Sequence, residues 1–157
     1  MFEAIYKKLA RNVEHHRILC GDFNSPLQEM ADGQIMTCDQ ETPGIRRRYI
    51  IGEWWRDRRD RKFPEERWDM AERQVLQGLR RYDLSDVFRA KHPYGQEEFS
   101  NYTNNRGKHI GRRFDHIFAS HLLEVVECEY LQELRVQKLS DHAPIEALFT
   151  PKERIRI

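Results

Sequence analysis

Three short polar clusters carry the side chains that could do chemistry, and each one ends or interrupts an apolar run. They are Asp22 with Asn24, Arg113 with Asp115, and Ser140-Asp141-His142. Carboxylate oxygens suit a hard cation, and amide or imidazole groups suit a phosphate. Taken singly, the same residues are also typical of a turn, a surface ion pair and a hydrogen-bonded histidine. Their combination, in this order along the chain, is more specific than any one of them.

Strands must position these clusters. The apolar, β-prone run at 18–22 predicts a buried strand whose carboxyl end presents Asp22 and Asn24 at a sheet edge. The alternating pattern over 112–119 predicts a second strand, in which Arg113 and Asp115 share one face. The Ser140-Asp141-His142 cluster lies between two further predicted strands, at 125–131 and 144–149.

Helical spacing of apolar residues predicts two amphipathic helices, over residues 2–14 and from Pro64 to about Arg81. Residues 83–88 are expected to form a short helical turn. The sequence over residues 99–103 predicts a strand, which leads into a hairpin turn at 104–107. A helix followed directly by a strand is typical of a β-α-β unit, and parallel pairing would need an earlier strand.

The length of 157 residues indicates one domain, 1–157, and the formal net charge is +1. Because basic and acidic side chains are nearly equal in number, the chain lacks the overall positive charge by which a strongly basic domain attracts nucleic acid. Any site for a polyanion must therefore be a local group of basic residues. The three cysteines form no C-x-x-C pair, which argues against a disulfide framework and a zinc ribbon and favours a reducing, cytoplasmic location. Since no apolar run reaches the roughly 18 residues of a membrane span, we expect a soluble protein.

Residues 27–67 are interrupted by glycine and proline, which predicts a long surface excursion. Within it, Arg46–Lys62 interleaves basic and aromatic side chains. Phosphate contacts and base stacking would use such a segment. The alternative is a solvated loop in which alternating charges make weak ion pairs.

Three strings carry a resemblance to a known family: C-G-D-F-N (20–24), R-R-F-D-H-I-F-A-S (112–120) and L-S-D-H-A-P-I (139–145). They resemble the last three signature motifs of the endonuclease/exonuclease/phosphatase superfamily, in matching order and spacing. The chain beyond Trp68 is similar to the exonuclease III type of apurinic endonuclease. The resemblance implies an α/β (α+β) fold, the C-terminal half of a four-layered α/β sandwich, with a mixed β-sheet and helices on its outer face.

The resemblance also implies roles for site residues in divalent-metal-dependent phosphoester hydrolysis. His142 would contact the scissile phosphate, with Asp141 or Asp115 holding its tautomer. Asp22 would activate the attacking water or assist the leaving oxygen, and Asn24 would donate to a phosphate oxygen. Asp22, Asp141 and Asp115 are the candidates to hold Mg²⁺ or Mn²⁺.

Arg113 and Tyr102 are, with Asn24, the expected substrate contacts. Members of the abasic-site branch tend to carry a tryptophan in the segment matching 99–102, where this chain has Asn101 and Tyr102. The resemblance therefore favours nuclease chemistry in general over abasic-site specificity.

The family's first half, with an asparagine and the principal metal-ligand glutamate, has no counterpart here. A sandwich cut between its sheets leaves an apolar face that needs cover. We expect self-association (a homo-oligomer), a separate N-terminal half, or a truncated gene product. The residues expected on or near this face are Ile18, Cys20, Phe114, Phe118 and Val125.

The leading hypothesis is a metal-dependent phosphodiester hydrolase, an endonuclease or exonuclease acting on DNA with a role in DNA repair. Two alternatives stay open. One is a catalytically silent binding or assembly module, and the other is a phosphatase of a small phosphorylated molecule.

Overall fold

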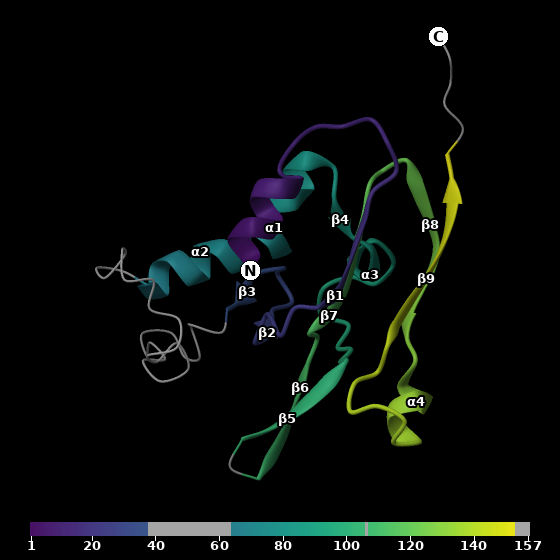
Figure 1. The fold of residues 1–157 in the computed structure, drawn as a ribbon. Coiled ribbons are helices and arrows are strands. Elements are labelled where there is room, and N and C mark those ends of the chain that lie inside the picture. The colour runs from purple at the N-terminus through teal and green to yellow at the C-terminus, as the bar shows by residue number, and fades with distance from the viewer. Residues whose placement is uncertain (38–63, 106, 153–157) are drawn as a thin grey trace.

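A computed structural model describes residues 1–37, 64–105 and 107–152, and these form helices and short antiparallel sheets (Figure 1). The predicted α/β class is confirmed. The expected basic excursion Arg46–Lys62 lies outside the described residues. The elements in chain order are α1 (Phe2–Leu9), β1 (Ile18–Asp22), β2 (Gln28–Glu29), β3 (Ile35–Met36), α2 (Pro64–Leu76), η2 (Gly78–Tyr82), β4 (Ser85–Asp86), α3 (Val87–Lys91), β5 (Asn101–Asn105), β6 (Lys108–Arg112), β7 (Asp115–Ala119), β8 (Leu123–Tyr130), α4 (Gln132–Val136) and β9 (Ile145–Pro151).

A three-stranded sheet in the order β1-β7-β4 is the centre of the fold. β7 pairs antiparallel with β1 on one side and with β4 on the other. The register sets Ile18 opposite Ala119 and Asp22 opposite Asp115. Every strand pair among the described residues is antiparallel, so the parallel pairing suggested by the helix-then-strand start is not among them.

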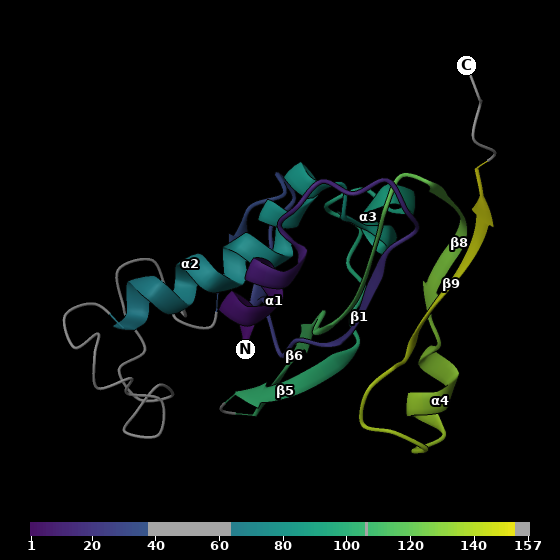
Figure 2. The same ribbon diagram turned by 45° about the horizontal axis from the view of Figure 1, so that its top comes forward.

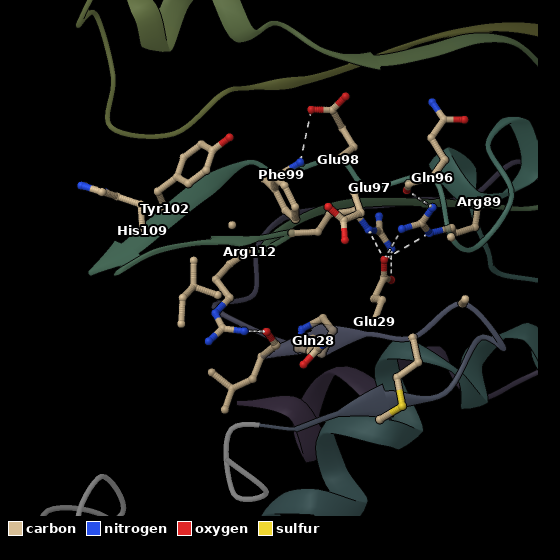
Figure 3. A pocket seen from close by; sticks show the side chains of 18 of the residues that line it. Gln28, Glu29, Arg89, Gln96, Glu97, Glu98, Phe99, Tyr102, His109 and Arg112 are labelled. Atoms are coloured by element: carbon tan, nitrogen blue, oxygen red, sulfur yellow. Dashed lines mark hydrogen bonds and ion pairs between the residues drawn. The ribbon is translucent and has the colours of Figure 1, made fainter. Parts of the chain in front are cut away.

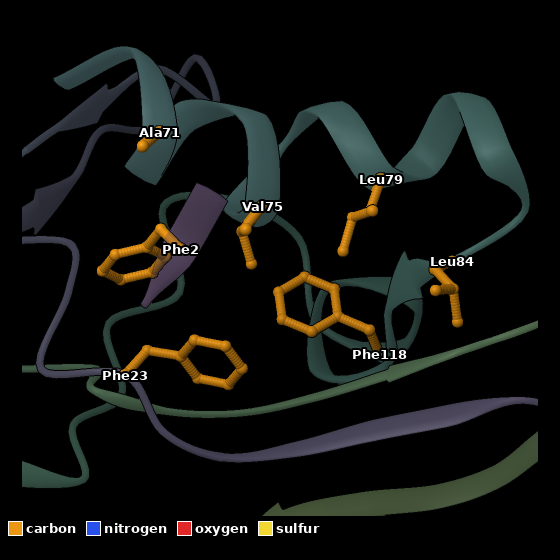
Figure 4. Packing of buried hydrophobic residues seen from close by; sticks show 7 residues of the cluster. All are labelled: Phe2, Phe23, Ala71, Val75, Leu79, Leu84 and Phe118. Carbon is orange, nitrogen blue, oxygen red and sulfur yellow. The ribbon is translucent and has the colours of Figure 1, made fainter. Parts of the chain in front are cut away.

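One face of the central sheet packs against α1, α2 and η2. Phe118 of β7 is 1% exposed and meets Val75 and Leu79, which are fully buried (Figure 4). Phe23, just after β1, lies edge-on to the Phe118 ring at a centroid distance of 5.8 Å. These helices are therefore stabilised mainly by burying one apolar stripe against the sheet.

The other face of β7 packs against α3 and the β8–β9 hairpin. Ile117 and Ala119 of β7 join Phe88, Cys128 and Tyr130 in a second buried cluster. In both views the β8–β9 hairpin lies on the opposite side of β1 and β7 from α1 and α2 (Figure 1, Figure 2). The central sheet is thus covered on both faces around β7.

β1 differs from its prediction as a buried strand, because most of its residues are exposed. Ile18 is 54% exposed and Cys20 is exposed, whereas Leu19 packs against the helices. β1 is an edge strand, and the β8–β9 hairpin covers β7 rather than the same face of β1.

The two predicted helices are shorter than expected, for local reasons. α1 ends at Leu9 rather than residue 14, and the Arg17 guanidinium donates to the carbonyl oxygens of Leu9 and Arg11, which satisfies acceptors at this helix end. The helix from Pro64 ends at Leu76, and the chain continues as the 3₁₀ helix η2 from Gly78. Glycine is a poor helix former, so it marks this break.

The predicted strand 112–119 is divided into β6 and β7. Arg112 ends β6, and Asp115 begins β7, so Arg113 and Asp115 do not belong to one regular strand. The backbone N–H groups of Phe114 and Asp115 both donate to the Oγ of Ser100, which is fully buried and fixes the bend. β5 and β6 form a hairpin near the predicted turn, but the first strand covers 101–105 rather than 99–103 and the second strand begins at Lys108.

Candidate active site

Asp22, Asp115 and His142 come together from three distant parts of the chain. Asp22 is the last residue of β1, Asp115 is the first residue of β7, and His142 lies in the loop before β9. Each side chain offers one ligand atom, and the three atoms lie within 4.8 Å of one another. The cluster forms because β1 and β7 pair in a register that sets the two aspartates opposite each other.

Asp22 is held by the turn that follows β1. The backbone N–H and the side-chain amide of Asn24 donate to the two Asp22 carboxylate oxygens, at 2.8 and 3.1 Å. Asn24 adopts a left-handed conformation with φ 50°, which asparagine tolerates better than most residues. Phe23 between them is buried and donates its N–H to the Phe114 carbonyl. Asn24 therefore lies at the same strand end as Asp22, as expected. Its side-chain amide orients Asp22, and its predicted contact with a phosphate oxygen stays a prediction.

His142 donates from Nδ1 to the Asp115 carboxylate at 2.6 Å. An ionised carboxylate only accepts, so this contact assigns the proton to Nδ1 and leaves Nε2 for another partner. Burial lowers the pKa of His142, but the hydrogen bond and charge of Asp115 and the charges of Asp22 and Asp141 outweigh it, so the pKa is raised. The His142 imidazole is thus predisposed to be a cationic donor.

Local backbone contacts hold the loop that carries His142. The His142 N–H donates to the Ser140 Oγ at 3.0 Å. The next residue, Ala143, is fully buried and donates its N–H to the Ser100 carbonyl at 2.7 Å. Ser100 therefore fixes both Asp115 and the His142 loop, although no sequence pattern marked it as more than a strand residue. The Tyr130 hydroxyl adds a hydrogen bond to the Asp115 carbonyl.

The donor set of this cluster fits a hard divalent cation. Carboxylates of Asp22 and Asp115 offer oxygen atoms within the 4.8 Å spread, and Mg²⁺ takes few carboxylates and completes its shell with water. Asp141 is not a member of the compact group, but its charge acts on His142 and its carbonyl accepts from the Asn101 amide. Asp22 and Asp115 thus lie in the compact group, whereas Asp141 is exposed outside it and its metal-binding role stays a prediction.

Arg113 is not brought to this cluster. Its side chain is 3% exposed and makes ion pairs with Glu29 and Asp86, each at 2.5 Å. Glu29 also pairs with Arg89, and Figure 3 shows its carboxylate between two guanidinium groups at one side of a cavity of about 710 Å³. Because the chain bends after Arg112, Arg113 points into the protein and joins a buried ionic network.

This network includes a residue that the sequence could have marked. Asp86 precedes α3, and its carboxylate accepts from the Arg89 N–H as a helix N-cap. Aspartate just before an apolar helical turn is a recognised start signal. Its partners Arg113 and His116 could not be found in the same way, because both are far from it in sequence.

We expect the protein to lose stability in acid because of this network. Burial alone would raise the pKa of Glu29 and of Asp86, but hydrogen bonds and charges lower both instead. Arg113 and Arg89 lower the pKa of Glu29, and Arg113 and His116 lower the pKa of Asp86. Carboxyl groups with a lowered folded pKa stabilise the protein above their unfolded pKa, about 4, and this contribution is lost as the pH falls. Urea unfolding at pH 5, 4 and 3 should give a free energy of unfolding that declines below about pH 4. Equal values at pH 5 and pH 3 would contradict this prediction.

Tyr102 lies on β5 and is 41% exposed. The Arg135 guanidinium stacks on its ring, with the Arg135 Cζ 4.4 Å from the ring centroid. Its neighbour Asn101 bonds to Asp141, so Tyr102 is one residue from a contact with the site loop. The structure thus sets Tyr102 beside the candidate site, whereas Arg113 is buried away from it.

The expected apolar face is only partly seen. Ile18 and Cys20 are exposed on β1, whereas Phe114 and Phe118 are buried and Val125 is half-buried against the second cluster. Cover of this face by a second copy or a separate N-terminal half stays a prediction.

Among the described residues, no helix combines the length and hydropathy that crossing a bilayer requires.

Comparison with known proteins adds one finding. Residues 4–142 match the model of the Endonuclease/Exonuclease/phosphatase family, a range that includes Asp22, Asp115 and His142. No significant match was found among curated proteins or among solved structures. The family match does not decide between the exonuclease III type and other members. Since the match covers most of the chain and the site residues lie inside it, the chain belongs to the endonuclease/exonuclease/phosphatase family of phosphoesterases.

Proposed function

We propose that the chain is a divalent-metal-dependent phosphodiester hydrolase that acts on DNA, with a role in DNA repair. The observation that carries this proposal is the cluster of Asp22, Asp115 and His142, whose ligand atoms lie within 4.8 Å. Two carboxylates and an imidazole at a strand end offer a base, a cation site and a donor to phosphate.

Each side chain has a distinct task in this proposal. His142 donates from Nε2 to a non-bridging oxygen of the scissile phosphate, where negative charge grows in the transition state. Asp115 holds the His142 ring and tautomer through the 2.6 Å hydrogen bond to Nδ1. Asp22 accepts the proton of the attacking water, and Asn24 keeps its carboxylate in place. Bound Mg²⁺ or Mn²⁺, held by Asp22 and Asp115, supplies positive charge against the phosphoryl oxygens.

The experiment that tests this function measures hydrolysis by the purified chain. Substrates are bis(p-nitrophenyl) phosphate, plain duplex DNA, abasic duplex DNA and inositol phosphates, each with Mg²⁺, Mn²⁺ or EDTA. The background is the double variant Asp22→Ala with His142→Ala. We expect metal-dependent cleavage of DNA and of the aryl diester above this background, and none in EDTA.

The outcomes separate the alternatives. Rates equal to the double variant for every substrate would leave only a binding or assembly module. Hydrolysis of inositol phosphates without cleavage of DNA would reassign the chain to small-molecule phosphatases. Equal cleavage of plain and abasic duplex would keep the nuclease and remove abasic-site specificity.

A further inference from the structure

A second cavity, of about 500 Å³, opens beside the candidate site. It lies between β5 and the segment from α4 to the site loop, and Ser140 and Asp141 at its edge directly precede His142 in the chain. Figure 1 shows α4 and this loop next to the base of the β5–β6 hairpin. Its lining residues are Asn101, Tyr102, Arg135, Lys138, Ser140 and Asp141.

Arg135 lines this cavity, and the hydrogen bonds of its guanidinium within the described residues go to the Gln132 amide rather than to a carboxylate. Its guanidinium stacks on the Tyr102 ring at 4.4 Å, and its Nε and Nη2 donate to the Gln132 Oε1 at 3.2 and 3.0 Å. Gln132 is itself held, because its amide donates to the Phe99 carbonyl at 2.7 Å and to Glu98 at 2.6 Å. The guanidinium is therefore preorganised, and its remaining N–H groups are available to an anion.

Lys138 adds a second positive charge to the same cavity. It has a left-handed backbone conformation with φ 60°, just after α4. Its N–H donates to the Arg135 carbonyl at 2.9 Å, and the Leu139 N–H donates to the Leu134 carbonyl at 3.0 Å, which closes the helix end. The turn thus keeps Lys138 on the wall that carries Arg135.

The lining of the cavity carries charges of both signs. Asp141, which directly precedes His142 in the chain, supplies the acidic part, and Arg135 and Lys138 supply the basic part. A fixed guanidinium and an ammonium together match a phosphate group, and a stacked arginine binds phosphate oxygens in its own plane.

We propose that Arg135 and Lys138 bind a second, non-reacting backbone phosphate of a nucleic-acid strand whose neighbouring phosphate lies at His142. This inference rests on the phosphodiesterase function proposed above, because both phosphates belong to one substrate. It makes the cavity a determinant of specificity for a polymeric diester over an isolated one. Tyr102 contributes by positioning the Arg135 guanidinium.

The test measures binding without catalysis. A fluorescein-labelled single-stranded octanucleotide is titrated with protein in EDTA, and the dissociation constant is followed by anisotropy from 50 to 300 mM salt. The variants are Arg135→Gln, Lys138→Gln and their combination. The matched control is Arg80→Gln on η2, an exposed residue on the element that contacts α1 and α2, with the same change of charge.

We expect the double variant to bind about tenfold more weakly at low salt, and its slope of log K against log[salt] to be smaller by roughly 0.7, because the contact with one phosphate of a single strand is lost. Arg80→Gln should match the wild type. A double variant with the wild-type slope, an equal loss in Arg80→Gln, or no binding by the wild type would each overturn the inference. Binding as expected without any hydrolysis would instead remove the proposed catalytic function, so the two failures are distinguishable.

Discussion

Replacing His142 with alanine is expected to lower the proposed phosphodiester hydrolysis by about 10²- to 10⁴-fold. In the proposed function the imidazole meets the growing charge on the phosphate, and its Nδ1 is held by Asp115 at 2.6 Å. Initial rates with bis(p-nitrophenyl) phosphate in saturating Mg²⁺ or Mn²⁺ measure the loss. Asp115→Asn should lower the rate as well, because an amide can offer its own N–H to the ring and favour the wrong tautomer.

A second histidine–aspartate pair supplies the matched control. His121 Nδ1 lies 2.7 Å from Asp83, and the His121 side chain is 67% exposed, but the pair has no part in the candidate cluster. His121→Ala should therefore keep the wild-type rate. Circular dichroism of each variant separates lost catalysis from lost folding. Equal rates for His142→Ala and the wild type would remove His142 from the mechanism.

Replacing Arg113 with methionine lowers the free energy of unfolding by about 3 to 5 kcal/mol. Methionine fills similar space but removes the cation that pairs with Glu29 and Asp86, which are themselves nearly buried. The negative charges of the two carboxylates would then be neutralised less fully. Glu29 would keep its ion pair with Arg89, whereas Asp86 would lose its ion pair with Arg113. Urea unfolding at pH 7, followed by circular dichroism, measures the loss.

A more exposed ion pair provides the comparison. Arg73 on α2 pairs with Asp69 at 3.0 Å, and the two side chains are 33% and 22% exposed. Since partly exposed pairs of this kind contribute about 0–1 kcal/mol, Arg73→Met should cost far less than Arg113→Met. Similar losses for the two variants would contradict the assignment of Arg113 to a buried structural network.

Local patterns predicted the elements and the candidate site better than they predicted the environment of single residues. The strand at Ile18–Asp22 has its predicted bounds, and Asp115 and His142 lie close to Asp22, whereas Arg113 and Asp141 from the same two polar clusters are not in this compact group. Spacing within one segment can predict a strand. It cannot predict exposure, which depends on what packs against the strand, and Ile18 is 54% exposed for that reason.

Arg113 illustrates the same limit more sharply. An alternating pattern over 112–119 indicated one strand, because apolar and polar residues continue in register across it. The buried Oγ of Ser100 accepts from two successive N–H groups at that point, and the chain bends. Neither that hydroxyl nor the carboxylates of Glu29 and Asp86 lie near Arg113 in sequence. No pattern in the neighbouring sequence therefore indicated that the Arg113 side chain would be buried.

The pairing of β1 with β7 also determines when the site can exist during protein synthesis. Ile18 pairs with Ala119, so β1 is made about a hundred residues before its partner strand. At translation rates of roughly 5–20 residues per second, the interval between the synthesis of β1 and that of β7 is on the order of 5–20 s. During this interval Asp22 has neither Asp115 nor His142 beside it. The candidate catalytic centre therefore cannot form before residues 115–142 have been synthesised, and contacts so distant in sequence also favour slow folding.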